Sequence, residues 1–269
     1  MPETDTGERP GTEADVTDAA LGATGLTKRF GGIVAVDDVN IAVPTGELRA
    51  VIGPNGAGKT TLFNTLTHAL APTGGEGYLH GEEITHVPQE QRPHRGLARS
   101  FQSNELFNEL TVLENVRIVV QTSETGTFSF GLLGDGRSQH VDRASEILES
   151  VGLSRKRETT AKNLSHGDQR RLGIAMALAT DPSVLLLDEP TSGLGSKETG
   201  QITDLIRTVQ EDLGLTLMLI EHDMGIVLSI SDRITVLNRG RVLATGTPAE
   251  VQANQEVQDA YLGGMKEEI

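Results

Sequence analysis

The stretch that decides the fold is Gly53-Pro54-Asn55-Gly56-Ala57-Gly58-Lys59-Thr60-Thr61, which lies between an apolar segment, 48–52, and a segment of helical pattern, 60–70. Its glycines let the backbone wrap so that several N–H groups point at one anion, and the following helix adds the positive end of its dipole. In a loop of this pattern, Lys59 contacts the β- and γ-phosphates of a nucleotide and the Thr60 hydroxyl binds Mg²⁺. A Gly-rich turn that only joins a strand to a helix is the weaker interpretation, because motif and flanking segments agree.

Composition excludes several classes of protein. The 269 residues suit one large α/β domain, or a core with a smaller inserted subdomain. The sequence has no cysteine, which removes disulfides, thiolate-bound metals and thiol catalysis. Its 23 Lys and Arg against 38 Asp and Glu give a net charge of −15, which argues against binding to nucleic acid or to lipid headgroups. Because no apolar run reaches 18 residues and no signal-peptide pattern occurs, a membrane role requires a protein partner.

The pattern along the chain predicts an α/β fold: a phosphate-loop (P-loop) core with a mostly parallel sheet, an N-terminal antiparallel β region and an inserted helical subdomain. Residues 1–18 are polar and acidic, which is typical of a disordered tail. We expect the core in two parts, 19–95 and 171–240, separated by the helical subdomain at 96–170. Residues 241–269 form a C-terminal extension in this division.

Polar side chains follow two strands that are predicted to be buried, 184–187 and 217–220. Active residues of open α/β sheets lie at the carboxyl ends of strands, where Asp188 and Glu189 fall. Asp188 fits a carboxylate that holds Mg²⁺ directly or through water, and Glu189 fits the base that deprotonates an attacking water. His222 follows the second strand and could donate to the γ-phosphate. The two acids could instead be a solvated strand end, which the phosphate loop disfavours. Taken alone, His222 would more often be an ordinary surface or capping histidine, so its interpretation depends on the order and co-occurrence of the motifs.

The sequence gives less specific evidence on which base the nucleotide carries and which residue binds it. Phe30 precedes the phosphate loop in a chain with 3% aromatic residues, and we interpret it as a platform on which adenine stacks. A Phe at the edge of the core is the alternative. A guanine nucleotide is disfavoured because no Asn-Lys-x-Asp segment occurs. A dinucleotide site is disfavoured because the third glycine of its motif is missing.

Several motifs in fixed order resemble those of the ATP-binding subunits of ABC transporters, over a range from about Ala23 to Gly263. They are the phosphate loop, Gln102, Leu164-Ser165-His166-Gly167, Leu185-Leu186-Leu187-Asp188-Glu189-Pro190 and Glu221-His222-Asp223. The resemblance implies that two subunits form a head-to-tail dimer around two ATP molecules. It also implies that Ser165 and Gly167 contact the γ-phosphate bound by the opposite subunit. Gln102 would sense Mg²⁺ and link the site to the membrane domain.

Within that family, five segments are similar to the ATPases of branched-chain amino-acid importers, and to related urea and amide importers: 27–39, 99–102, 221–224, 246–251 and 260–263. This implies an ATP hydrolase that drives solute import through separate transmembrane permeases, with an external solute-binding protein. It would lie at the cytoplasmic face of the cell membrane as a dimer with itself or with a second ABC ATPase. The alternatives are a soluble ABC-type ATPase acting on nucleic-acid or protein complexes, which would need coiled-coil arms or a second cassette, and an export ATPase.

Three positions depart from the family pattern. His166 replaces the usual second glycine of the Ser165 segment, Asp168 replaces a glutamine, and Gly195 stands where many members carry aspartate. An acid facing a γ-phosphate would be unfavourable by a few kcal/mol. We therefore expect Asp168 to point away from the site or to pair with Arg170 or Arg171.

Overall fold

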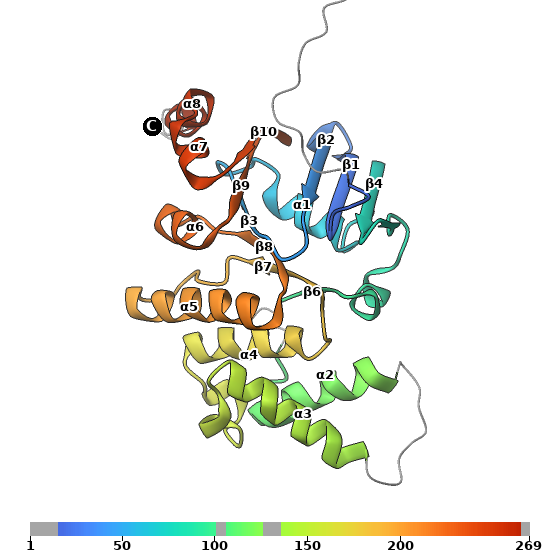
Figure 1. Cartoon of the computed structure of the whole chain (residues 1–269), viewed down its shortest axis with the longest axis vertical. Helices are drawn as coiled ribbons and strands as arrows, with labels where there is room; N and C mark the ends of the chain where they lie inside the picture. Colours follow the sequence, from blue (N-terminus) through green and yellow to red (C-terminus); the bar gives the residue numbers. More distant parts are fainter. Residues whose placement is uncertain (1–15, 101–105, 126–135, 265–269) are drawn as a thin grey trace, which may run out of the picture.

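A computed structural model of the chain describes residues 16–100, 106–125 and 136–264. Within these ranges, the strands around the phosphate loop lie in a six-stranded sheet with the order β10-β9-β3-β8-β7-β6 (Figure 1). Adjacent strands of this sheet pair in parallel, except that β10 pairs antiparallel with β9. Its strands are β3 (Leu48–Ile52), β6 (Leu97–Arg99), β7 (Val184–Asp188), β8 (Thr216–Ile220), β9 (Arg233–Asn238) and β10 (Arg241–Gly246).

A second sheet, antiparallel throughout, precedes and follows the phosphate loop in the chain. Its order is β2-β1-β4-β5. The strands are β1 (Leu21–Phe30), β2 (Ile33–Val43), β4 (Gly74–Leu79) and β5 (Glu82–Glu83). This combination of a mostly parallel sheet with an N-terminal antiparallel one confirms the predicted fold class.

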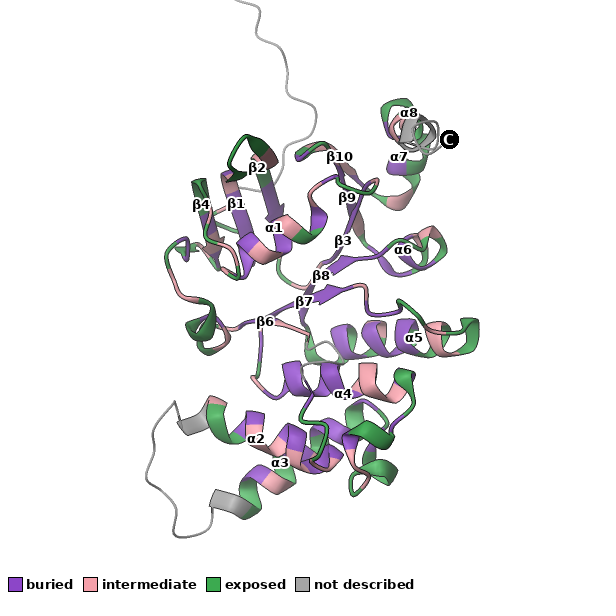
Figure 2. Cartoon of the chain, turned by 180° about the vertical axis from the view of Figure 1, so that it is seen from behind, coloured by how far each residue is buried: buried purple, intermediate pink, exposed green. Residues whose placement is uncertain are grey.

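Helices cover the main sheet and extend the molecule at one end. The described helices are α1 (Lys59–Leu66), α2 (Val112–Thr125), α3 (Gly136–Ser150), α4 (His166–Leu178), α5 (Ser196–Leu213), α6 (Met224–Ile230), α7 (Pro248–Ala253) and α8 (Gln255–Gly264). Figure 1 shows α2 and α3 side by side at the end away from the antiparallel sheet. Figure 2 shows that the buried surface of α4 and α5 continues the buried interior of the sheet. None of the described helices combines the length and apolar character needed to cross a bilayer.

Two strands bear on the predicted division into domains, which itself stays a prediction. Strand β6 lies inside the range 96–170, yet it pairs with β7 as part of the main sheet. Strand β10 begins the range 241–269 and pairs with β9. Both strands are short, so their apolar pattern in the sequence is too brief to separate them from the segments that follow.

The register of three central strands determines where the phosphate loop lies. In β3, β7 and β8 all five residues are buried. Val51 of β3 pairs with Ile220 of β8, and Asp188 of β7 pairs with the same Ile220. The three strands therefore end at the same edge of the sheet, so that the segments following them meet there.

A buried arginine connects the two sheets beneath this edge. Arg49 on β3 is 2% exposed, and its guanidinium donates to the Ala42 carbonyl at 3.1 Å and to the Thr235 hydroxyl at 3.0 Å. Its Nε also pairs with the Glu47 carboxylate at 2.5 Å. A buried arginine is tolerated because the planar guanidinium satisfies several acceptors at once.

Replacing Arg49 with methionine should lower the free energy of unfolding by roughly 3 kcal/mol, because buried acceptors and the Glu47 carboxylate lose their donor. Urea denaturation followed by circular dichroism measures this. Arg143→Met is the matched control, since Arg143 is half exposed and pairs only with exposed acids in the contacts described; we expect a change below about 0.5 kcal/mol. Equal losses in the two variants would contradict the role of Arg49.

Candidate nucleotide site

The phosphate loop leads from β3 into α1 with a backbone that requires glycine at two positions. Gly58 has φ 103°, and a Cβ on it would lie 2.3 Å from the carbonyl oxygen of Ala35. A Cβ on Gly53 would lie 2.2 Å from the carbonyl oxygen of Leu237. The loop is thus held closely between β2 and β9, which leaves its N–H groups on the opposite side for an anion.

Lys59, the first residue of α1, is 6% exposed and folds back over the loop. Its ammonium donates to the carbonyl of Gly53 at 2.7 Å and to that of Pro54 at 3.2 Å. Burial lowers the pKa of Lys59, and the negative charges of Glu189 and Asp188 partly offset this. The ammonium lies where the phosphates of a nucleotide in the loop would meet it.

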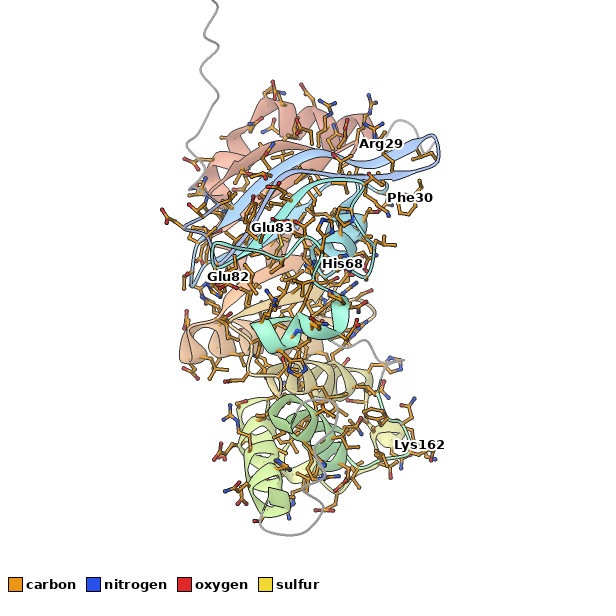
Figure 3. All side chains as sticks on the ribbon, turned by 90° about the vertical axis from the view of Figure 1, so that its right-hand side faces the viewer. Arg29, Phe30, His68, Glu82, Glu83 and Lys162 are labelled. Carbon is orange, nitrogen blue, oxygen red and sulfur yellow. The ribbon has the colours of Figure 1, made fainter. Side chains whose placement is uncertain are left out.

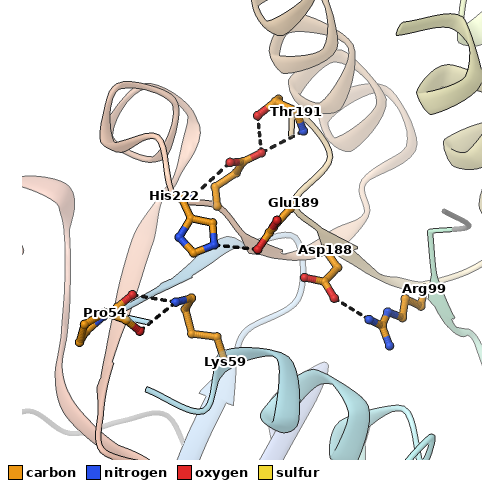
Figure 4. A network of polar contacts seen from close by, with 9 residues as sticks. Pro54, Lys59, Arg99, Asp188, Glu189, Thr191 and His222 are labelled. Atoms are coloured by element: carbon orange, nitrogen blue, oxygen red, sulfur yellow. Dashed lines mark hydrogen bonds and ion pairs between the residues drawn. The ribbon is translucent and has the colours of Figure 1, made fainter. Parts of the chain in front are cut away.

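Glu189 and His222 meet across the ends of β7 and β8, as Figure 4 shows. The His222 Nε2 lies 2.7 Å from Glu189 Oε1, so the ring N–H donates to the carboxylate. Glu189 has φ 47°, a left-handed conformation that costs a non-glycine residue about 1 kcal/mol or more. Its N–H donates to the Ile220 carbonyl at 2.9 Å, and this bond helps to hold the turn. Both side chains are partly exposed, which keeps them accessible to a ligand.

Glu221 holds the segments that carry these two groups, and our sequence analysis assigned it no role. It is 4% exposed. Its Oε1 accepts from the N–H and hydroxyl of Thr191, at 3.0 and 2.5 Å, and its Oε2 accepts from the His222 N–H at 3.1 Å. The available signal was a third carboxylate directly after a buried strand, but a buried acid and an exposed one look alike in a sequence.

Asp188 and Thr60 are the described residues that could hold Mg²⁺. Asp188 is largely buried, and its carboxylate pairs with Arg99 at 2.5 Å. Thr60 is exposed at the start of α1. The described residues contain no cluster of three or more acidic, His or Cys side chains that could enclose a metal ion. A hydroxyl and one carboxylate nevertheless fit Mg²⁺, which prefers oxygen ligands and commonly takes the others from water and substrate phosphates.

A cavity of about 360 Å³ collects most of the predicted residues. Its lining consists of Ala35, Asn55, Gly56, Ala57, Gly58, Lys59, Thr60, Thr61, Glu189 and His222. Phe30 is not part of the lining. Figure 3 shows it at the end of the β1–β2 hairpin, where it is 46% exposed. The centroid of its ring lies 5.1 Å from the Lys28 ammonium. Ser165 and Gly167 also lie outside the lining. Gln102 falls in 101–105, outside the described residues.

Ser165 is the N-cap of α4, and its hydroxyl oxygen accepts from the Asp168 N–H at 3.3 Å. The expected partners of Asp168 were wrong. Its carboxylate pairs with Lys156 and accepts from the Ser165 hydroxyl at 2.9 Å. Arg170 and Arg171 donate to main-chain carbonyls elsewhere. The turn before α4 places Lys156 beside the first turn of the helix, while both arginines point to other segments.

A strand, a phosphate loop, a helix and acidic groups at neighbouring strand ends define the class of P-loop nucleotide-binding proteins. The chain belongs to the ABC transporter family, whose model matches residues 36–192. A second model, described as a branched-chain amino acid ATP-binding cassette transporter, matches residues 241–267. The chain is accordingly an ATP-binding ATPase of the ABC type.

Similar proteins include one curated relative and two solved structures. The chain is 45% identical over 249 residues to the high-affinity branched-chain amino acid transport ATP-binding protein LivG of Escherichia coli (strain K12), covering 90% of this chain and 97% of that relative. It is similar to the ADP conformation of an ATP-binding cassette of an ABC transporter, at 29% identity and a TM-score of 0.80, with 91% of this chain and 98% of that one covered. A dimeric cassette in a post-hydrolysis state, bound to ADP and phosphate, is 29% identical, with a TM-score of 0.72 and 85% and 98% covered.

Replacing Gly58 with alanine should weaken ATP binding at least roughly tenfold, because the new Cβ must push the loop away from the Ala35 carbonyl and spoil the alignment of its N–H groups. Equilibrium binding of ATP measures the loss. Gly200→Ala is the matched control, since Gly200 lies in α5 with open space around it. ATP affinity that stays the same in both variants would show that the loop tolerates displacement.

Proposed function

We propose that this ATPase powers the import of branched-chain amino acids through separate membrane permeases, with an external solute-binding protein delivering the solute. Two observations support this substrate class: the match of residues 241–267 to the branched-chain amino acid cassette model, and the 45% identity to LivG over nearly the whole chain. The acidic composition supports neither the nucleic-acid alternative nor direct lipid insertion. In this proposal the chain is cytoplasmic and bound to the inner face of the cell membrane through the permeases.

The mechanism that we propose rests on the convergence of Lys59, Glu189 and His222 on one cavity. Loop N–H groups and Lys59 bind the phosphates, and their positive field favours the charge that develops at the γ-phosphate. The carboxylate of Glu189 accepts a proton from the attacking water. His222 donates to this carboxylate at 2.7 Å, so it orients the base and stands next to the reacting phosphate. Glu221 is a positioning residue for both.

Mg²⁺ would be held by Thr60 and Asp188, with Gln102 as the third predicted ligand. When bound, the ion supplies positive charge to the phosphate oxygens. The protein's contribution is to hold the Asp188 carboxylate at the end of β7 beside the loop, where β7 is buried throughout and cannot shift without disturbing the sheet.

The site of one chain is incomplete without a second subunit in our proposal. Ser165 and Gly167 lie outside the cavity of their own chain, and Ser165 caps a helix whose N-terminus suits an anion. We propose that they contact the γ-phosphate held by the opposite subunit, in a dimer of this chain with itself or with a second ABC ATPase. The dimeric cassette bound to ADP and phosphate supports such an assembly. Phe30, exposed on its hairpin, would stack on adenine.

Replacing Glu189 with glutamine should leave ATP affinity within about twofold while lowering hydrolysis by two to three orders of magnitude, roughly the contribution of a general base. The shape and the contact with His222 are kept, so the loss reports proton transfer. Phosphate release measures turnover, and size-exclusion chromatography with MgATP should detect a trapped dimer. Glu211→Gln, on the exposed side of α5, is the control and should hydrolyse ATP normally. Turnover retained by Glu189→Gln would remove Glu189 as the base.

The substrate class is tested by transport. Proteoliposomes that contain the chain with its cognate permeases and solute-binding protein should accumulate leucine, isoleucine and valine only with MgATP. Lys59→Ala should abolish uptake, because the cation that holds the phosphates is lost. Uptake of another solute under the same conditions would overturn the substrate. Purification from cells with nucleic acid or ribosomes in place of polytopic membrane proteins would overturn the transport function.

A further inference from the structure

Arg99 lies at the end of β6, in contact with α1 and β7, and has none of the roles assigned above. Its Nη2 donates to Asp188 Oδ2 at 2.5 Å, and its Nη1 donates to the Asn64 side-chain oxygen at 2.6 Å (Figure 4). The Asp188 side chain is 7% exposed and that of Arg99 is 24% exposed. Asn64 belongs to α1, the helix that begins with Lys59 and Thr60. One guanidinium therefore joins the acidic strand end to the phosphate-loop helix.

This contact occupies the carboxylate that Mg²⁺ requires. A guanidinium stays protonated at any physiological pH, so its charge at Asp188 is permanent. Low exposure limits the screening of that charge by water and salt. A divalent ion that approaches the same carboxylate is repelled by this positive charge. Mg²⁺ also requires a nearly ideal octahedral set of ligands, so it cannot easily shift its position to avoid the guanidinium. Arg99 contacts one of the two carboxylate oxygens, and both cations draw on the same single negative charge, so each weakens the binding of the other.

We propose that Arg99 is the counter-cation of Asp188 in the metal-free site and that Mg²⁺ displaces it from the carboxylate. This inference rests on the proposed roles of Thr60 and Asp188. In the metal-free site, Arg99 balances the negative charge of the buried Asp188 carboxylate. Its second contact, to Asn64, links α1 to the end of β7. On metal binding the guanidinium leaves Asp188. The position of the Arg99 side chain, at the end of β6, then depends on whether Mg²⁺ is bound. Arg99 is a positioning residue in this role and does not touch the nucleotide.

The test measures how Mg²⁺ promotes the binding of a fluorescent ADP, which avoids any dependence on hydrolysis. Arg99→Gln removes the charge but keeps hydrogen-bonding capacity. We expect the Mg²⁺ concentration at half-saturation to fall roughly tenfold, the size expected when one charged hydrogen-bond partner is lost. Binding of the same ADP in EDTA should stay within about twofold of the unaltered chain, because the loop and Lys59 are untouched. Asn64→Ala frees the other side of the guanidinium and should produce a smaller shift in the same direction.

Two further variants make the result specific. Arg95→Gln removes a charge four residues away, where Arg95 is half exposed and 3.9 Å from Glu82, and should leave the Mg²⁺ midpoint unchanged. Arg99→Lys keeps the positive charge but lacks the planar guanidinium that reaches two acceptors. Its Mg²⁺ midpoint should therefore lie between those of the unaltered chain and Arg99→Gln. A midpoint in Arg99→Gln that is equal to or above that of the unaltered chain would overturn the proposal, because Arg99 would then hold Asp188 for the metal. An unaltered chain that bound no ADP would overturn the proposed function itself.

Discussion

The parallel pairing of β3, β8 and β7 is the constraint on which the site depends. All the residues of these strands are buried, so both faces of each strand are covered, and a shift of one strand along its neighbour would move apolar residues out of the core at one end. In the observed register the three strands end at one edge. The phosphate loop, Glu189 and His222 then have no other place to lie. The groups at this edge are thus positioned by three strands that are buried along their whole length.

Charge compensation is the second condition that the site satisfies. Buried carboxylates are costly unless they are paired or hydrogen-bonded, and each one near the cavity has such partners. Asp188 has Arg99, and Glu221 accepts three hydrogen bonds from the segments on either side. Glu189, by contrast, is partly exposed and keeps one hydrogen bond to an imidazole. Its carboxylate therefore stays accessible to a ligand, while those of Asp188 and Glu221 are held in place by their partners.

The sequence alone predicted the parts of this arrangement that depend on local pattern. Apolar runs located β3, β7 and β8, and the loop motif located the turn between β3 and α1. Contacts between distant segments were missed or wrong. The pairing of Asp168 with Lys156 depends on the path of the turn before α4, and that of Arg99 with Asp188 depends on which strand neighbours β7. The local pattern of apolar residues does not determine the order of strands in a sheet or the path of a loop. The partners of Asp168 and Asp188 could therefore not be predicted from the sequence.

The position of Ser165 outside the cavity is the reason that we propose a dimer as the complete form of this site. Lys59, Glu189 and His222 are fixed to the main sheet, whereas Ser165 begins a helix that packs with the helical end of the molecule. Among the described residues, neither Ser165 nor Gly167 lines the cavity of its own chain, and Asp168 beside them pairs with Lys156. In the dimer that we propose, a second subunit that supplies this surface would make the strength of the interface depend on the γ-phosphate. Release of the cleaved phosphate would then remove the anion that both subunits share, and the loss of this shared ligand would couple the chemistry to separation of the two chains.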